Sequence, residues 1–190
     1  QEYFGHQYFQ NTWYGESIYH DNSYQLFEAG DRLFLNINVA WESFGADIDW
    51  IVDVISAHPG LPTILNRHCF FSSMTGQYSG IWNTNAYWES AIKNNDQIFM
   101  MIMGHTTTQY KNFTNAQGNK VQWLRADYQY DALGGGGYLR KMIFEEDNNK
   151  IKIRTYSPYL DSYKTDADNQ FDITLNFNAR FGQPPATPTS

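Results

Sequence analysis

Two largely apolar runs that each end in a histidine place the strongest constraint on how this chain can fold. The first run covers 63–67 and stops at His68, and the second covers 98–103 and is followed by Gly104 and His105. Short apolar runs without alternation are typical of strands that are covered on both faces of a sheet. A polar side chain that follows such a strand lies at the sheet edge, where ligands of α/β proteins bind. A lone histidine there is usually structural, but two strand ends of this kind can converge on one site.

Strand and helix patterns alternate through the N-terminal half of the chain. Strand patterns cover 32–40, 61–67 and 98–103, and helix patterns cover 47–57 and 78–93. The breakers His58-Pro59-Gly60 end the first helix. This alternation predicts an α/β fold.

From residue 121 onward the pattern changes to short runs that are typical of an antiparallel sheet. These runs cover 121–128, 138–144 and 151–156, and 171–177 is the last expected strand. The polar residues 145–150 suit a hairpin turn. The four glycines at 134–137 are followed by neither Lys-Ser/Thr nor a helix, so we interpret them as a flexible turn rather than a phosphate-binding loop.

Composition predicts one domain in an aqueous environment. The 190 residues are 42% hydrophobic and 17% aromatic, which is enough apolar material for a single core. We expect this domain over 1–180 and a Pro/Thr-rich linker or tail over 181–190. No apolar run reaches the roughly 18 residues of a membrane span. The net charge of -7, without clustered Lys and Arg, disfavours nucleic acid as a partner. Few lysines and abundant Asn, Tyr and Trp predict a secreted or extracellular protein.

Several segments resemble, in their order and spacing, one group of metal-dependent enzymes. The stretch 49–68 resembles a helix-then-strand unit that ends in a metal-binding histidine, and 98–107 resembles the strand that carries a Gly-His-x-His motif. The segments 122–130, 134–147 and 151–161 resemble the C-terminal part of the same proteins. Together they cover nearly the whole chain, which resembles the C-terminal half of a calcineurin-like metallophosphoesterase of a bacterial, secreted branch.

This resemblance implies a layered α/β/β/α sandwich with mixed and antiparallel sheets, and hydrolysis of phosphate esters as the ancestral activity. It implies that His68 and His105 are ligands to the same one of two divalent ions, drawn from Fe, Zn or Mn. The second histidine of the motif is replaced by Thr107, whose neutral hydroxyl is a poor ligand for a transition ion. The N-terminal motifs of the family, Asp-x-His, Gly-Asp-x-x-Asp and Gly-Asn-His-Asp/Glu, do not occur in this sequence. Gly30-Asp31 starts like the second of them but lacks its second carboxylate.

Two hypotheses from different classes follow. In the first, the chain is part of a metallophosphoesterase, and it is catalytically incomplete unless an N-terminal half supplies the other ligands of one divalent metal ion or more. In the second, the fold is kept without the chemistry, as a non-catalytic secreted structural or binding module that assembles with other chains. The residue Thr107 favours the second. In both cases we expect an N-terminal half or another copy of the chain to cover open sheet faces.

Other polar residues have structural explanations beside functional ones, and none is assigned a catalytic role. Cys69 is the single cysteine, so no intrachain disulfide is possible, and its apolar neighbours predict a small buried side chain rather than a nucleophile. Asp127 is expected to bond a turn rather than to act in catalysis. Asn112-Phe113-Thr114 meets the glycosylation pattern and marks Asn112 as the candidate site of a glycan.

We predict that the isolated chain retains no tightly bound divalent transition ion. Its candidate ligands, His68 and His105, leave most of a coordination shell to water. Metal analysis of the purified chain after dialysis measures this directly. Stoichiometric zinc, iron or manganese in the dialysed protein would contradict the prediction.

Overall fold

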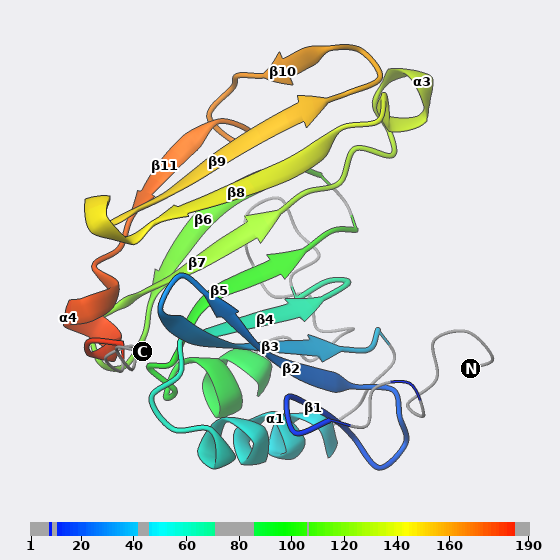
Figure 1. The fold of residues 1–190 in the computed structure, drawn as a ribbon. Helices are drawn as coiled ribbons and strands as arrows, with labels where there is room; N and C mark the ends of the chain where they lie inside the picture. Colours follow the sequence, from blue (N-terminus) through cyan, green and yellow to red (C-terminus); the bar gives the residue numbers. More distant parts are fainter. Residues whose placement is uncertain (1–7, 9–10, 42–45, 71–85, 106, 185–190) are drawn as a thin grey trace.

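The strands in the described part of the chain form two sheets, one of seven strands and one of four (Figure 1). The structure is a computed structural model that describes residues 8, 11–41, 46–70, 86–105 and 107–184. The larger sheet has the order β1-β2-β3-β4-β5-β7-β6. Its strands are β1 (Tyr14–Glu16), β2 (Ser23–Ala29), β3 (Arg32–Val39), β4 (Thr63–Arg67), β5 (Ile98–Met103), β6 (Gln109–Thr114) and β7 (Lys120–Arg125).

The centre of the seven-stranded sheet is parallel. The strands β3, β4, β5 and β7 run in one direction, whereas β2 pairs with β3 and β6 pairs with β7 in the antiparallel sense. The helix α1 (Ala46–Ala57) lies between β3 and β4 in the chain, and the π-helical segment η2 (Tyr87–Ile92) precedes β5. Because the central strands are parallel, their carboxyl ends all lie at one edge of the sheet.

The smaller sheet is antiparallel throughout. Its strands are β8 (Leu139–Glu145), β9 (Lys150–Ser157), β10 (Ser162–Lys164) and β11 (Phe171–Thr174). The 3-10 turn η3 (Glu146–Asn148) and Asn149, in the left-handed conformation with φ of 52°, close the hairpin between β8 and β9. Two short helices, α3 (Ala132–Gly135) and α4 (Phe177–Phe181), precede and follow the strands of this sheet.

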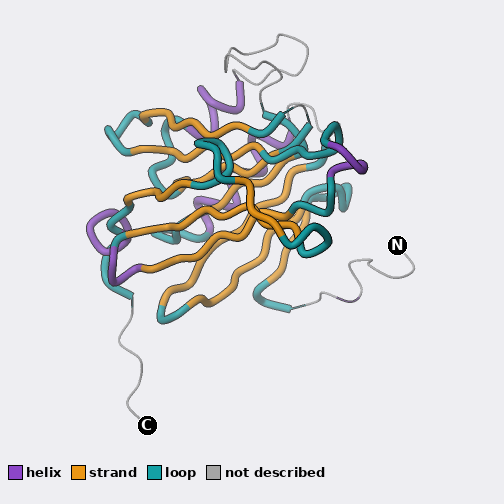
Figure 2. The backbone as a smooth tube through the Cα atoms, turned by 90° about the horizontal axis from the view of Figure 1, so that it is seen from above, coloured by secondary structure: helices purple, strands orange, loops and turns teal. Residues whose placement is uncertain are grey.

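Helices cover one face of the seven-stranded sheet, and the four-stranded sheet packs on the other (Figure 1). On the helical side, α1 buries Ile51 and η2 buries Ala91 against sheet residues such as Leu65. Figure 2 shows the chain turned by 90°, with the strands of the sheets in orange and the helices in purple. Cover on both faces explains why β5 is apolar without alternation.

Aromatic rings fill the core between the two sheets. Phe99 of β5 is fully buried, and its ring centroid lies 5.4 Å from that of Phe177 and 6.5 Å from those of Phe34 and Phe144. These rings come from strands of both sheets and from α4, so they join the layers at one point. Ring pairs at such separations add to the free energy of apolar burial.

The four-stranded sheet is narrower than the sheet on which it packs. The strand β8 pairs with β9, and its other edge has no strand partner in the described part of the chain. Alternation places Asn36 and Asn66 on the same face as Phe34 and Ile64, but these amides are half-buried. Asn36 donates to Gln25 Oε1 (3.0 Å), and Asn66 donates to Asn36 Oδ1 (2.5 Å). This part of the face therefore presents a row of amides rather than apolar side chains.

Most of the predicted elements are present. The strands expected at 32–40, 61–67, 98–103, 138–144 and 151–156 correspond to β3, β4, β5, β8 and β9, and the helix expected at 47–57 corresponds to α1. Of the helix expected at 78–93, residues 78–85 lie outside the described residues. The fold is mixed α/β with one mixed and one antiparallel sheet, as expected. Among the described residues, no helix has both the length and the apolar character needed to cross a membrane.

Several strand predictions differ from the structure. The strands β1, β2, β6 and β10 were not expected, and β6 is a sheet edge with one partner and little buried surface. The strand expected over 121–128 ends at Arg125, since the chain then turns so that Asp127 N–H reaches Thr108 Oγ1 (3.3 Å). The strand expected over 171–177 ends at Thr174, because Asn176 caps α4 by accepting from Ala179 N–H.

We predict that Phe99→Ala strongly destabilises the fold. Removing a fully buried ring of this kind costs about 3–5 kcal/mol. Urea unfolding followed by circular dichroism measures the loss. Tyr130→Ala is the control, because this side chain is 81% exposed, and it should change the free energy of unfolding by less than about 0.5 kcal/mol. Equal losses in the two variants would show that the rings between the sheets do not form the core that we describe.

Candidate functional site

Three aromatic side chains gather at the carboxyl edge of the seven-stranded sheet. Trp41 follows β3, His68 directly follows β4, and His105 follows β5 after Gly104. The strand β4 pairs in parallel with both β3 and β5. Neighbouring strand ends therefore deliver the three rings to one place.

The two histidines contact each other directly, and we refer to His68 and His105 as the histidine pair. His68 Nε2 lies 3.0 Å from His105 Nδ1, which is hydrogen-bonding distance. One of these nitrogens donates its N–H and the other accepts. The ring of Trp41 packs against both imidazoles, with centroid distances of 4.4 Å to His68 and 4.8 Å to His105. The structure thus brings together both histidines that the sequence singled out.

The backbone at His105 is in an unfavourable conformation. Its φ is 86°, in the left-handed region that residues with a side chain rarely adopt. The preceding Gly104 donates its N–H to the carbonyl of His68 (3.0 Å), which ties the two loops together. Such conformations persist where surrounding structure holds them, and they concentrate at functional sites.

Arg67, the last residue of β4, lies behind the loop that carries His68. Its side chain is buried, with Nη1 donating to the carbonyl of Cys69 (2.8 Å) and Nη2 to that of Trp41 (2.9 Å). The guanidinium also lies 4.8 Å from the centroid of the Tyr87 ring. Arg67 therefore fastens the loop after β3 to the loop after β4.

Arg125, the last residue of β7, holds the loop after β5 in the same way. It is fully buried, and it donates from Nε to the carbonyl of Thr107 (2.8 Å) and from Nη2 to Thr107 Oγ1 (2.7 Å). Its guanidinium lies 5.0 Å from the centroid of the Trp123 ring. The resemblance predicts a further histidine at the position of Thr107. The hydroxyl of Thr107 is instead bonded to a buried arginine.

The surroundings of the histidine pair favour a neutral imidazole at His68. Although the side chain reaches solvent, partial burial of the ring lowers the pKa of His68, and the nearby His105 and Arg67 lower it as well. The carboxylate of Asp127 acts on this pKa in the opposite direction. Because a metal ion binds the deprotonated nitrogen of imidazole, a lowered pKa favours metal binding near neutral pH.

The histidine pair does not by itself make a complete metal site. Across the residues that the structure describes, no cluster of three or more His, Cys, Asp and Glu side chains could hold a metal ion. A hollow of about 210 Å³ adjoins Thr107 and contains the ion pair of Lys164 with Asp131 (2.9 Å). Its two carboxylates, on Asp127 and Asp131, do not form a metal-binding group with the histidines. Further ligands would have to come from elsewhere.

The remaining candidate residues are accounted for by structure. Cys69 is buried, as predicted. Asp127 Oδ1 accepts from the backbone N–H of Gln129 (3.1 Å), which is the expected turn bond. The glycines at 134–137 all have positive φ, between 57° and 100°, which is a backbone conformation that a tight turn of glycines adopts. Asn112 is exposed on the edge strand β6.

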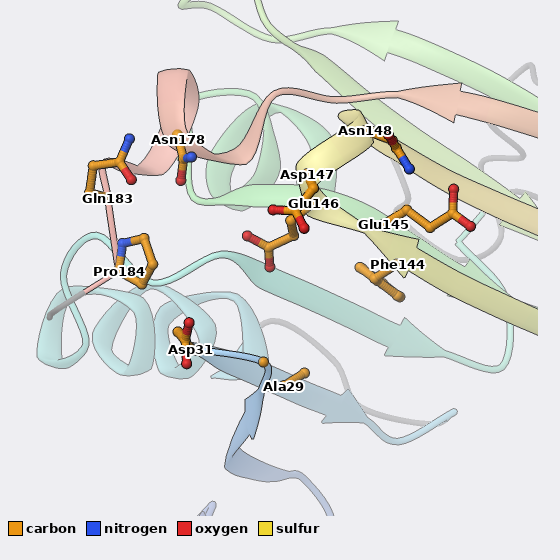
Figure 3. Close-up of a pocket in the computed structure, with 11 residues that line it drawn as sticks. Ala29, Asp31, Phe144, Glu145, Glu146, Asp147, Asn148, Asn178, Gln183 and Pro184 are labelled. Carbon is orange, nitrogen blue, oxygen red and sulfur yellow. The ribbon is translucent and has the colours of Figure 1, made fainter. Parts of the chain in front are cut away.

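A larger hollow, of about 630 Å³, lies at the opposite edge of the seven-stranded sheet (Figure 3). The turn between β2 and β3, the turn between β8 and β9, and residues around the end of α4 form it. Its carboxylates belong to Asp31, Glu145, Glu146 and Asp147. An acidic lining of this kind disfavours phosphate and other anions. We therefore place the candidate site at the histidine pair.

The sequence reasoning did not identify Trp41, Arg67 and Arg125 as parts of this site. Each arginine is the last residue of a strand that is otherwise largely buried, which is the signal that was available. A charged residue seldom occupies such a position unless its donors find partners. Those partners are loop carbonyls from other strands, so only the folded chain reveals them.

Comparison with known proteins gives one distant relative and no family. No family model matches the chain. The chain is similar to a Bacillus subtilis (strain 168) protein described as "Uncharacterized protein YvnB", at 26% identity over 194 residues. The match covers 94% of this chain but 15% of the Bacillus protein, so the chain spans a small part of that relative's length.

We predict that His68 titrates below the 6.5 of an ordinary histidine, and that His105→Ala raises its pKa. Folding favours the neutral ring, so below pH 6.5 the unfolded chain binds more protons than the folded chain. The contribution of His68 to the free energy of unfolding is therefore fully present above pH 6.5, and it is lost as the pH falls toward the pKa of the folded state. A two-dimensional NMR titration of the imidazole carbons measures the pKa. His58→Ala is the control, because its ring bonds the carbonyl of Val54 in α1. A midpoint for His68 at or above 6.5 would contradict the prediction.

Proposed function

We propose that this chain is the C-terminal half of a calcineurin-like metallophosphoesterase domain. His68 and His105 bind one divalent ion of Fe, Zn or Mn, together with ligands that an N-terminal half supplies. The complete domain hydrolyses a phosphate ester. This chain alone is catalytically incomplete, because two imidazoles cannot form a two-metal site.

The observation that carries the proposal is the distance of 3.0 Å between His68 Nε2 and His105 Nδ1. When two imidazole nitrogens bind the same zinc ion at ~2.0–2.1 Å, the two nitrogens lie roughly 3 Å apart. The lowered pKa of His68 keeps its nitrogen available to a metal. Imidazole is a good ligand for zinc and iron, so the donor type also fits.

The layers of the fold support the same proposal. The helices, the seven-stranded sheet and the four-stranded sheet correspond to three layers of an α/β/β/α sandwich. Strands of an N-terminal half would continue the narrower sheet from the unpaired edge of β8. They would then cover the half-buried amides of Asn36 and Asn66, which offer hydrogen bonds to a covering segment.

The residues of this chain supply binding and orientation. When bound, the metal ions of such a site polarise the phosphate and provide a hydroxide. His68 and His105 hold one ion, and Trp41 packs against both rings and restricts their rotation. The buried guanidinium of Arg67 bonds neutral carbonyls, so its positive charge favours an anionic ligand at this edge.

A non-catalytic binding or structural module of a secreted protein is the second candidate. The observation that favours it is the bond of Thr107 Oγ1 to Arg125 Nη2 (2.7 Å). That hydroxyl is part of the structure and is a poor replacement for an imidazole ligand. The second metal ion would then receive no imidazole from this position. The chain would act by binding other molecules through its surfaces, without catalysis.

Expression of this chain together with the coding segment upstream of Gln1 tests the proposal. We expect that segment to carry the Asp-x-His, Gly-Asp-x-x-Asp and Gly-Asn-His motifs. The longer protein should retain metal and hydrolyse p-nitrophenyl phosphate. His68→Ala and His105→Ala should each lower kcat/KM by about 100-fold or more, because outer partners of metal ligands alone are worth about 10–100-fold. His58→Ala should leave kcat/KM unchanged.

Different results would support the second candidate. An upstream segment without these motifs would remove the metallophosphoesterase proposal. A folded longer protein that has the motifs but neither retains metal nor hydrolyses the aryl phosphate would do the same. If Thr107→His restores metal and activity in that protein, the threonine is the cause of the loss.

A further inference from the structure

We infer that Arg125 and Thr107 form a clamp that positions His105, so that Arg125 is a positioning residue of the histidine pair. The inference rests on the proposed function for what the pair binds, but the clamp itself is defined by contacts between described residues. Thr107 then anchors the loop after β5, because its hydroxyl accepts the hydrogen bond from Arg125 that holds this loop.

The clamp acts two residues beyond His105. Arg125 bonds both the carbonyl (2.8 Å) and the hydroxyl (2.7 Å) of Thr107, and its Nη2 also lies 3.4 Å from Gln109 Oε1. Contacts to the main chain and the side chain of one residue fix both its position and its orientation. His105 has the unfavourable φ of 86°, so its loop needs to be held from outside. The bond from Gly104 to the carbonyl of His68 then sets the distance between the two rings.

Arginine is suited to this position and lysine is not. The guanidinium is planar and offers several donors in a fixed arrangement, and it stays charged when it is buried against Trp123. A lysine offers one nitrogen at the end of a flexible stem, so it cannot bond both acceptors of Thr107 in the same geometry. Thr107→Ser keeps the hydroxyl, whereas Thr107→Val keeps the shape and removes it.

The chain provides a matched control in Arg180. Its side chain is 4% exposed, and it donates to the carbonyls of Asp96 (2.8 Å), Ile98 (3.1 Å) and Lys120 (2.7 Å). These acceptors lie at the amino ends of β5 and β7, at the sheet edge opposite the histidine pair. Arg180→Lys therefore removes the same kind of contact without touching the site.

The experiment compares Arg125→Lys, Thr107→Val, Thr107→Ser and Arg180→Lys with the unaltered chain. Two quantities are measured, the NMR cross-relaxation between the rings of His68 and His105 and the weak affinity for Co²⁺ followed by absorbance. Arg125→Lys and Thr107→Val should lose the cross-peak and weaken Co²⁺ binding about tenfold, at the lower end of the effect of outer partners on metal affinity. Thr107→Ser and Arg180→Lys should keep the cross-peak and bind Co²⁺ within about twofold of the unaltered chain.

Three results would overturn the clamp. The first is a Thr107→Val variant that keeps both the cross-peak and the Co²⁺ affinity. The second is an Arg180→Lys variant that loses them as Arg125→Lys does, because the loss is then a general one of packing. The third is a Thr107→Ser variant that behaves like Thr107→Val. If Arg125→Lys does not fold, the two Thr107 variants decide the question. If the unaltered chain shows the cross-peak without any Co²⁺ response, the clamp is judged by the cross-peak alone, and the proposed function is judged by metal retention in the longer protein.

Discussion

The parallel pairing of β4 with β5 is the interaction on which the candidate site depends. In its register Leu65 lies opposite Met101 and Asn66 opposite Ile102, so both strands reach the same edge together. Helices bury one face of this pair, and the aromatic rings around Phe99 bury the other. Much of the pairing is thus protected from water, and the loops that follow it start from a rigid base.

Buried arginines extend that rigidity into the loops at both sheet edges. At the carboxyl edge, Arg67 and Arg125 bond carbonyls and a hydroxyl. At the opposite edge, Arg32 and Arg180 bond loop acceptors too, and they also form ion pairs with Glu146 (2.9 Å) and Asp96 (3.4 Å). Burying a guanidinium is costly unless its donors are bonded, so each arginine commits several loop atoms to fixed positions. Buried arginines thus hold the loops at both edges of the sheet, and at the carboxyl edge these loops carry the histidine pair.

The fold joins a well-packed core to a face that is polar. Between the sheets, Phe34 and Phe99 meet rings from β8 and α4, whereas further along β3 and β4 the same face carries Asn36 and Asn66. The amides on such a sheet face bond one another, and they have donors and acceptors left that can bond a covering segment as well. This change of character within one face is the observation behind our proposal that a further segment covers it next to β8.

The sequence by itself determined the α/β class, most strand positions and the two histidines at strand ends. These features are local, because the spacing of apolar residues and the residue that ends a run are written in consecutive positions. Only the tertiary structure decided that His68 Nε2 meets His105 Nδ1, that Trp41 packs on both rings, and that Arg125 bonds Thr107. Each of those contacts joins loops that follow different strands, so each depends on strand order and register. The edge strand β6 was missed for a related reason, because its pairing with β7 supplies the stability that its own pattern lacks.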